Sequence, residues 1–294
     1  MTRIAYLFGL VIVASNAVAQ GPLEPGQSPA PGMRTLLQIE PRTPISSLPY
    51  DIDQPGSYYV TGPLYTTNNR GITVMSSHVT VDLMGFTITG SQNTNGHGVH
   101  ILGGEDVMLR NVVVKNGGIT QFGYGVLVNN AIGGVLRDLV IYENIAEGIM
   151  IRNKAPGICA DFTVEHNVIT DNGASGIFIS GAGNDGGNRT HTIRNNKISG
   201  NLEHGVFMTF SRGCLVEGNH FGPQRLSAMT NAYAVRSGNS RNFIFRNVEI
   251  GNSNVFGNAY FAAPSADTLG PTINETGYLS HTNREVHPWS NFSR

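Results

Sequence analysis

Ionisable residues recur at one position of a short repeated phrase, and that position carries most of the candidate chemistry in this sequence. The phrase runs small–apolar–any–apolar, and its seven copies start at intervals of 27, 27, 23, 28, 29 and 27 residues. The residues directly before the copies are, in chain order, Arg70, His97, Tyr124, Glu147, Ser175, His204 and Asn231. If the copies stack as strands, neighbouring members of this column lie about 5 Å apart. Side chains from distant parts of the chain would then share one face.

These side chains suit a reaction that removes a proton beside a carboxylate. Arg152 or Arg70 can hold the carboxylate with two parallel hydrogen bonds. His97 or His100 can serve as the base, because the pKa of histidine lies near neutrality. Tyr124, one copy further along, can donate a proton to the departing oxygen. The sequence therefore predicts four catalytic residues, namely His97, His100, Tyr124 and Arg152.

Large side chains continue the same face and predict a binding strip. The outward position inside the phrase holds, in chain order, Thr73, His100, Leu127, Met150, Phe178, Phe207 and Ala234. The next outward position holds Asn129, Arg152, Ser180, Thr209 and Arg236. We expect six residues to bind substrate: Arg70, Glu147, Phe178, His204, Phe207 and Arg236. An alternative interpretation stays open, because histidine and tyrosine also fill turns, and a tail or a partner subunit can cover an apolar strip.

The repeat also predicts the fold that positions these residues. The phrases alternate apolar and polar residues and are rich in Val and Ile, which is typical of β-strands. Each interval holds a second phrase of this kind, such as VMLRNVVV (107–114), so little room remains for a helix. Leucine-rich repeats have a similar period, but their asparagine-containing LxxLxL phrase is missing. The sequence thus predicts an all-β protein, a right-handed parallel β-helix of about seven coils with an N-terminal cap starting within 49–66.

One column of polar residues has a structural explanation. The second phrase places Asn111, Asp138, Asn167, Asn196, Asn219 and Asn247 at what we expect to be the same turn of successive coils. Asparagine tolerates the left-handed backbone conformation, and its amide can bond the equivalent amide above and below. We therefore predict a structural ladder here and no catalytic role.

Composition limits the class of protein. The chain has 294 residues, with 37 glycines and 29 asparagines, and only 13% of its residues are charged. Few charged residues argue against a mainly helical protein, whose surface normally uses them. The formal net charge of −1 excludes a generally basic nucleic-acid binder. The two cysteines, Cys159 and Cys214, should lie two coils or about 10 Å apart. That distance exceeds the reach of a disulfide, so we expect two free, mostly buried thiols.

The two ends of the chain differ from the repeat. Residues 1–19 combine Arg3, a short apolar stretch and a small-residue cleavage site, which predicts a signal peptide removed before Gln20. Residues 20–40 are expected to form a flexible leader, 41–252 the β-helix, and 253–294 a tail that packs on or caps it. The prediction is a secreted or periplasmic protein without membrane insertion after signal removal.

The segment PRTPISSLPYDIDQPGSYYVTG, which begins at Pro41, and the following GITVMSSHVTVDLMGFTITG resemble the opening of secreted bacterial β-helix proteins of the pectin-lyase-like superfamily. The repeat over 41–252 is similar to that of NosD-like periplasmic β-helices. The resemblance implies a right-handed β-helix and a polysaccharide partner. Its members include lyases, hydrolases, uronate epimerases and noncatalytic surface proteins. Gly96-His97-Gly98 is also similar to a polygalacturonase motif, but the paired carboxylates that such hydrolysis needs are missing.

Taken together, these observations favour a lyase that cleaves an acidic, uronate-containing polysaccharide by β-elimination. The alternatives are a noncatalytic carbohydrate-binding or surface-structural β-helix, or a uronate epimerase. We predict no metal site and no cofactor, although calcium is possible through Glu147. Calcium takes six to eight oxygen ligands, and the sequence has no tight Asp/Glu cluster. The expected partner is a polysaccharide and not a nucleic acid, and self-association is possible.

Overall fold

The computed structural model describes residues 42–104, 107–181, 187–225, 233–238 and 241–249, and four short strands beyond them. Residues 1–41 lie outside the described residues, and so do the predicted signal peptide and leader. Every element in the described part is a β-strand. No described helix is long and apolar enough to cross a membrane.

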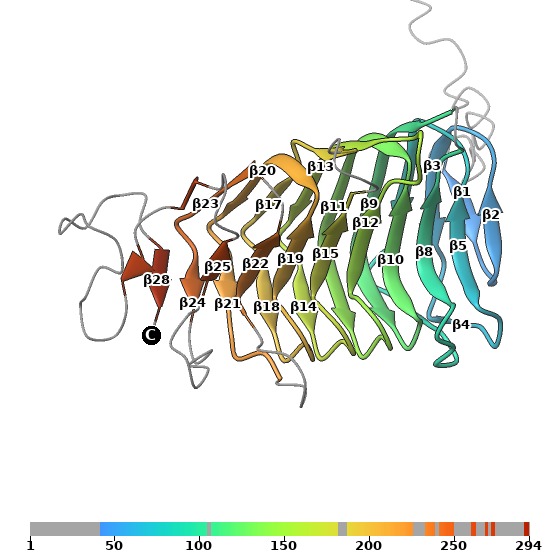
Figure 1. The fold of residues 1–294 in the computed structure, drawn as a ribbon. Coiled ribbons are helices and arrows are strands. Elements are labelled where there is room, and N and C mark those ends of the chain that lie inside the picture. Colours follow the sequence, from blue (N-terminus) through green and yellow to red (C-terminus); the bar gives the residue numbers. More distant parts are fainter. Residues whose placement is uncertain are drawn as a thin grey trace, which may run out of the picture. The chain divides into compact units, whose positions relative to one another are not determined.

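One sheet is built from the repeated phrase. Its strands lie side by side and parallel in Figure 1, and the predicted phrases make up seven consecutive members. The nine strands are β2 (Tyr50–Ile52), β5 (Arg70–Val74), β8 (His97–Leu102), β10 (Tyr124–Asn129), β12 (Ile149–Arg152), β15 (Ile177–Ser180), β19 (Val206–Thr209), β22 (Val235–Gly238) and β25 (Tyr260–Ala262). The prediction of an all-β, right-handed parallel β-helix is confirmed.

The second phrases form the rest of each coil. They belong to a nineteen-stranded sheet, which bends because β9 and β11 run around a corner and pair on both sides of it. Its strands are β1 (Thr43–Ile45), β3 (Gly56–Val60), β4 (Leu64–Tyr65), β6 (Val79–Asp82), β7 (Thr87–Thr89), β9 (Leu109–Thr120), β11 (Ala131–Tyr142), β13 (Cys159–Glu165), β14 (Val168–Thr170), β16 (Asn188–Arg189), β17 (Thr192–Arg194), β18 (Lys197–Ser199), β20 (Ser211–Glu217), β21 (His220–Phe221), β23 (Arg241–Phe245), β24 (Val248–Glu249), β26 (Thr268–Leu269), β27 (Thr272–Ile273) and β28 (Asn291–Ser293). Each complete coil therefore contributes strands to three faces.

The core fills the inside of the coils. Inward residues of the repeated phrase, such as Val99, Val126 and Ile149, are fully buried. The glycine that opens a phrase is required by this packing, because a Cβ atom at Gly98 would lie only 2.3 Å from Cγ2 of Ile119. The alternation that predicts the strands is thus the alternation between core and outer face.

The asparagine ladder is present, with two corrections. The side-chain amides of Asn167, Asn196, Asn219 and Asn247 bond one another in sequence at 2.9–3.0 Å. Asn111 and Asp138 do not belong to it. Asp138 precedes the ladder position by one residue, with φ of 55°, and pairs with Arg137 on the surface. Asn111, with φ of 53°, lies at a different bend and is exposed, since the structure needs a left-handed residue there too.

A second ladder runs through the next turn. The side chain of Asn144 donates to Asn172, that of Asn172 to Asn201, and that of Asn201 to Gln224, at 2.9–3.1 Å. All four side chains are buried. Each amide also bonds backbone groups of a neighbouring coil, so the two ladders fix the spacing of the coils at two of their corners.

The last predicted copy of the phrase is displaced by two residues. Strand β22 pairs Phe207 with Arg236, so Arg236 rather than Ala234 continues the column of Phe207. Tyr233, which the predicted phrase would place two positions further along, lies half-buried beside His204. The displacement follows from the small size that the first position of the phrase requires, because the backbones of neighbouring coils approach closely there. The fully buried Ala234 takes the place of the glycine at that position.

Part of the predicted tail extends the β-helix. Strands β25, β26 and β28 lie within 253–294 and pair with β22, β23 and β24. The two cysteines are buried and free, as predicted.

Candidate active site on the nine-stranded sheet

The outer face of the nine-stranded sheet gathers the residues that precede the repeated phrases. Across neighbouring strands Arg70 pairs with His97, and His97 with Tyr124. The column continues to Glu147, whose carbonyl accepts a hydrogen bond from the backbone N–H of Gly125, in the preceding phrase, at 3.2 Å. Arg70 is exposed, whereas His97, Tyr124 and Glu147 are half-buried. The prediction that these side chains share one face agrees with the register, and Asn231 lies outside the described residues.

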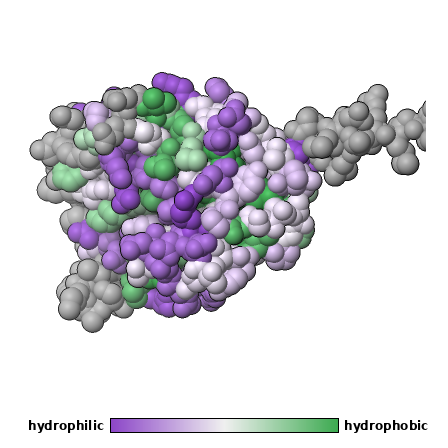
Figure 2. Space-filling view, turned by 90° about the vertical axis from the view of Figure 1, so that its right-hand side faces the viewer, coloured by the Kyte–Doolittle hydropathy of each residue, from purple (hydrophilic) through white to green (hydrophobic). Residues whose placement is uncertain are grey.

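Arg70 is held at the N-terminal end of this face. Its guanidinium forms an ion pair with Asp51 and lies 3.5 Å from the hydroxyl of Thr73. The hydrogen bond from Arg70 lowers the pKa of the Asp51 carboxyl. A hollow of about 400 Å³ opens beside Arg70, between Pro49 and 67–69. Figure 2 views this end of the coils, where hydrophilic and hydrophobic side chains alternate over the surface.

A hydrogen-bonded chain of four side chains occupies the middle of the face. Nε of Arg152 donates to Oδ1 of Asn129 at 3.1 Å. Nδ2 of Asn129 lies 2.8 Å from Nε2 of His100, and Nδ1 of His100 lies 3.1 Å from Nε2 of His97. The two imidazole rings meet edge to face, with centroids 4.3 Å apart. Both nitrogens of His100 therefore have protein partners, and neither is open to a substrate.

Burial makes these histidines poor bases. Burial lowers the pKa of His100, and the charges of His97 and Arg152 act in the same direction, so that together they bring it to about 3. Burial also lowers the pKa of His97, and the charges of Arg70 and Arg152 act in the same direction. Desolvation disfavours the charged imidazolium, and neighbouring cations repel it. Both rings are neutral at pH 7.

Tyr124 and Arg152 lie close together beside the histidines, and the charge of Arg152 reaches Glu147. The guanidinium carbon of Arg152 lies 6.0 Å from the centre of the Tyr124 ring. Burial raises the pKa of Glu147, nearby Glu203 raises it too, and Arg152 offsets part of the effect. The carboxyl of Glu147 has no side-chain hydrogen bond within the described residues, since its bond is to its own backbone amide. A carboxyl whose pKa lies above the usual value can take up and release a proton nearer neutrality.

Aromatic rings fill the C-terminal part of the face. Phe178 and Phe207 stack face to face, with centroids 4.7 Å apart and planes at 7°. The guanidinium of Arg236 covers the other side of Phe207 at 4.9 Å. His204 is buried against Phe207 and accepts the backbone N–H of Tyr233 on Nδ1 at 3.2 Å. Because the faces of the Phe207 ring are covered, only its edge is open to a ligand.

Comparison with known proteins agrees with this architecture. The family model described as "Right handed beta helix region" matches residues 64–221, which is more than half of the chain.

This chain belongs to the right-handed β-helix family.

Solved structures share the right-handed β-helix at low sequence identity. The enzymatically active domain of tailspike protein 2 from bacteriophage CBA120 is 14% identical, with a TM-score of 0.53 over 80% of this chain and 43% of that one. The Agl-KA catalytic domain is also 14% identical, with a TM-score of 0.50 over 86% of this chain and 47% of that one. The chain thus spans under half the length of these two structures, and the likeness concerns the fold. No curated protein is similar enough in sequence to count as a relative.

The sequence did not single out two members of the site. Asn129 stood only as an outward residue of its phrase, yet it joins Arg152 to His100 and is 2% exposed. Glu203 precedes His204, accepts a hydrogen bond from Ser175 at 3.3 Å and acts on Glu147 through its charge. Glu203 had a usable signal, because it lies next to the column. The part played by Asn129 depends on which way its amide points.

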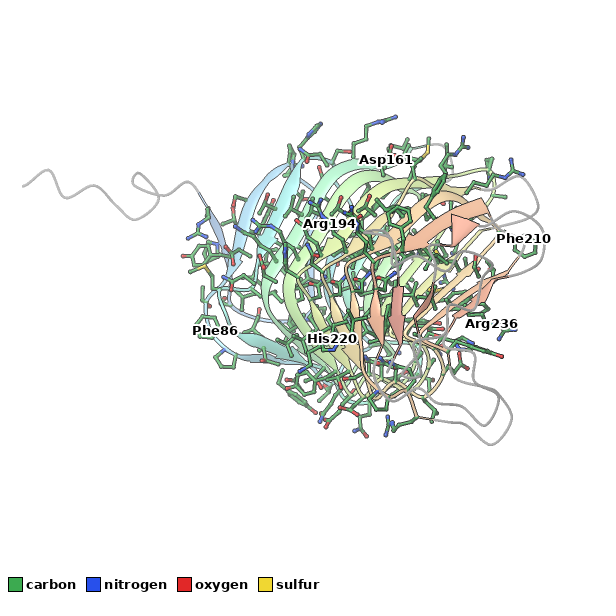
Figure 3. The ribbon with its side chains drawn as sticks, turned by 90° about the vertical axis from the view of Figure 1, so that its left-hand side faces the viewer. Phe86, Asp161, Arg194, Phe210, His220 and Arg236 are labelled. Atoms are coloured by element: carbon green, nitrogen blue, oxygen red, sulfur yellow. The ribbon has the colours of Figure 1, made fainter. Side chains whose placement is uncertain are left out.

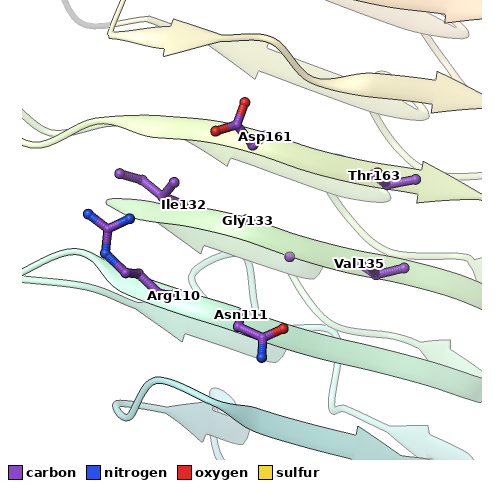
Figure 4. A pocket seen from close by; sticks show the side chains of 8 residues that line it. Arg110, Asn111, Ile132, Gly133, Val135, Asp161 and Thr163 are labelled. Atoms are coloured by element: carbon purple, nitrogen blue, oxygen red, sulfur yellow. The ribbon is translucent and has the colours of Figure 1, made fainter.

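Outside this face, the described residues form a further hollow on the nineteen-stranded sheet. A hollow of about 410 Å³ lies on the nineteen-stranded sheet, where Gly133, which has no side chain, lies between Asn111 and Asp161 (Figure 4). Figure 3 looks along the coils from the C-terminal side. It shows Asp161, beside this hollow, and Arg236, on the nine-stranded sheet, at different sides of the coils. Over the described residues, no group of three or more His, Cys, Asp or Glu side chains is arranged to hold a metal ion. Glu147 and Glu203 alone supply fewer oxygens than calcium takes.

Proposed function

We propose that this protein acts on an acidic, uronate-containing polysaccharide by β-elimination, at a site formed by Tyr124, Glu147 and Arg152. The observation that carries the proposal is that an acid, a base and a cation share one outer face: Tyr124 on β10, Arg152 on β12, and Glu147 directly before β12. The solved structures support the wider class, because two that share the fold are an enzymatically active tailspike domain and a catalytic domain.

Arg152 is suited to binding the uronate carboxylate. Its Nε is held by Asn129, which orients the guanidinium. Its two Nη groups have no hydrogen-bond partner among the described residues, so they can donate two parallel bonds to a carboxylate. Neutralising that carboxylate makes the hydrogen on the adjacent carbon easier to remove. Arg70, further along the same face, can bind a neighbouring uronate.

Glu147 and Tyr124 are assigned the two proton transfers. The carboxylate of Glu147 takes the proton from C5 of the uronate, and the electron pair of that bond forms the C4–C5 double bond. The bond between C4 and the glycosidic oxygen breaks, and the Tyr124 hydroxyl donates its proton to the departing oxygen. Exchange with water then returns both side chains to their starting states. Glu147 replaces His97 and His100 as the base because the nitrogens between the two rings are engaged and burial lowers the pKa of both rings, which makes them weak bases.

The remaining predicted residues would hold the polymer on either side of the reaction. Arg236 can bind a further carboxylate beside the exposed edges of Phe178 and Phe207. His204 is 2% exposed, so we assign it to positioning Arg236 and Tyr233 rather than to direct contact with substrate. The predicted export signal accords with an extracellular or periplasmic polymer, and we propose secretion or periplasmic location.

A screen of polyuronates and glycosaminoglycans tests the reaction class. Purified protein should release unsaturated products that absorb in the ultraviolet. Tyr124→Phe and Arg152→Ala should each lower the rate by about 100-fold or more, in line with lost proton transfer or charge stabilisation. Arg137→Ala is the matched control, because that arginine pairs with Asp138 on another face.

The same screen separates the alternatives. Solvent deuterium entering C5 without chain cleavage would identify an epimerase and overturn elimination. Binding without exchange or cleavage on any polymer would favour a noncatalytic carbohydrate-binding protein. Neither binding nor reaction on any acidic polymer would overturn the proposed substrate class.

A further inference from the structure

The side chain of Asn129 can be oriented without ambiguity because of its neighbour. The guanidinium of arginine only donates hydrogen bonds, so the atom of Asn129 that lies 3.1 Å from Nε of Arg152 must be its oxygen. The NH₂ group of Asn129 then faces Nε2 of His100 at 2.8 Å. Asn129 is buried, with 2% of its surface exposed, so no competing water-facing orientation is available to it.

The direction of the next two hydrogen bonds follows. Nε2 of His100 faces an N–H group, so it must accept, and the single proton of the neutral ring stays on Nδ1. Nδ1 of His100 lies 3.1 Å from Nε2 of His97, and it therefore donates to that nitrogen. Nε2 of His97 accepts, and the proton of the neutral His97 ring lies on Nδ1. No described residue is a hydrogen-bond partner of that Nδ1–H.

We infer that Asn129 is a positioning residue. Its orientation, set by Arg152, fixes which ring nitrogen carries the proton in His100 and in His97. His97 is thereby held as an N–H donor toward a bound ligand. The acceptor would be an oxygen of the substrate, such as a carboxylate or hydroxyl oxygen of a uronate. The identity of this acceptor rests on the proposed function, whereas the proton positions on the two rings do not. His97 then helps to hold an anionic ligand and does not remove a proton from it.

The surroundings of His97 agree with a neutral donor. The ring is half-buried, Arg70 lies on the neighbouring strand β5, and the charge of Arg152 reaches it from β12, two strands away. Two cations near an unprotonated ring, together with an N–H that has no partner among the described residues, create a site of positive potential without a proton that can be lost near pH 7. Hydrogen bonds to Arg152 and His100 also satisfy the amide of Asn129, although this residue of the outer face is covered by its neighbours.

One substitution should reverse the whole chain. A carboxylate only accepts, so in Asn129→Asp one oxygen would accept from Arg152 and the other from Nε2–H of His100. Nδ1 of His100 would then accept from Nε2–H of His97, and Nδ1 of His97 would become a free acceptor. Asn129→Leu, which has a similar size, removes the hydrogen-bonding group that fixes the protons. Each ring should then be a mixture of the form with the proton on Nδ1 and the form with the proton on Nε2.

Nitrogen NMR of the full chain labelled with ¹⁵N-histidine measures this directly. The sequence has nine histidines, and His97→Gln and His100→Gln assign the two signals. At pH 7 the wild-type protein should show both rings with the proton on Nδ1, and Asn129→Asp should show both with the proton on Nε2. Asn195→Asp is the charge-matched control, since Asn195 is exposed with φ of 55°, a conformation that aspartate tolerates; it should leave both rings unchanged.

The outcomes separate this inference from the proposed function. A wild-type spectrum with the proton on Nε2 of either ring would overturn the inference, even if Asn129→Asp failed to fold. Active enzyme with such a spectrum would leave the proposed function intact. Inactive protein with both protons on Nδ1 would support the inference and count against β-elimination.

Discussion

His191 is a fully buried histidine whose protonation the fold opposes. Its Nδ1 accepts the backbone N–H of Phe162 at 3.2 Å, and its Nε2 lies 3.4 Å from Oδ1 of Asn188. A proton on Nδ1 would face another N–H group. Burial lowers the pKa of His191 from 6.5 to about 4, with a small opposing effect of Asp161. The folded protein therefore binds this proton less readily than the unfolded chain.

This difference predicts a loss of stability in mild acid. Between the unfolded pKa of 6.5 and the folded pKa of about 4 the unfolded state binds more protons, so the free energy of unfolding falls as the pH falls through this range. From pH 7 to pH 5 the loss from His191 is about 2 kcal/mol. His100 and His204 are also buried, with pKa values lowered to about 3 and about 4. Each adds about 2 kcal/mol, which together approaches the total stability of many domains.

Denaturant titrations at pH 7 and pH 5 measure the effect. His191→Asn keeps an oxygen to accept the Phe162 N–H but does not titrate, so its loss of stability between the two pH values should be smaller than that of the wild type by about 2 kcal/mol. His166→Asn is the control, because His166 is exposed at a left-handed position that asparagine tolerates. An unchanged pH dependence in His191→Asn would refute the reasoning.

Three further predictions concern the fold and its processing. Asn196→Ala removes a buried link of the first ladder and leaves backbone and amide groups without partners, so the free energy of unfolding should fall by about 3 kcal/mol in a denaturant titration. Cys159 and Cys214 should resist a thiol reagent in the native protein and react fully after unfolding, because burial raises the pKa of Cys159 to about 11; a rapid native reaction would contradict their burial. If the signal peptide is removed as predicted, N-terminal sequencing of exported protein should begin at Gln20, and an intact Met1 would contradict it.

The fold was predictable because its signals are local and repeat. Alternating Val and Ile with a leading glycine identifies each strand of the nine-stranded sheet, and the common period places the strands in register. The prediction failed where the glycine is replaced, since Ala234 rather than an earlier residue fills the tight position and shifts Arg236 by two places. Sequence spacing alone cannot show which small residue packs there.

The asparagine ladders were also only partly predictable from sequence spacing. Asn111 and Asp138 match the phrase but adopt left-handed turns outside the ladder. The second ladder had an unused signal, because Asn144, Asn172 and Asn201 each stand four residues before the glycine of a repeated phrase. Both cases depend on how the chain bends between strands, and that geometry is not encoded in a single phrase.

The candidate site was predictable as a group but not in its internal chemistry. The column from Arg70 to Glu147 follows from the period, since stacked strands bring equivalent residues together. The hydrogen bond from Asn129 to His100 depends on side-chain direction and burial, and it changes the expected base from histidine to Glu147.

The most direct test of the proposed function is the initial rate at which Glu147→Gln forms unsaturated product on the polymer that the wild-type protein cleaves fastest. The substitution keeps the size of the side chain but removes its ability to take up a proton. The account predicts a rate at least about 100-fold below that of the wild type, with folding unchanged by circular dichroism. A Glu147→Gln variant that cleaves at the wild-type rate would contradict it.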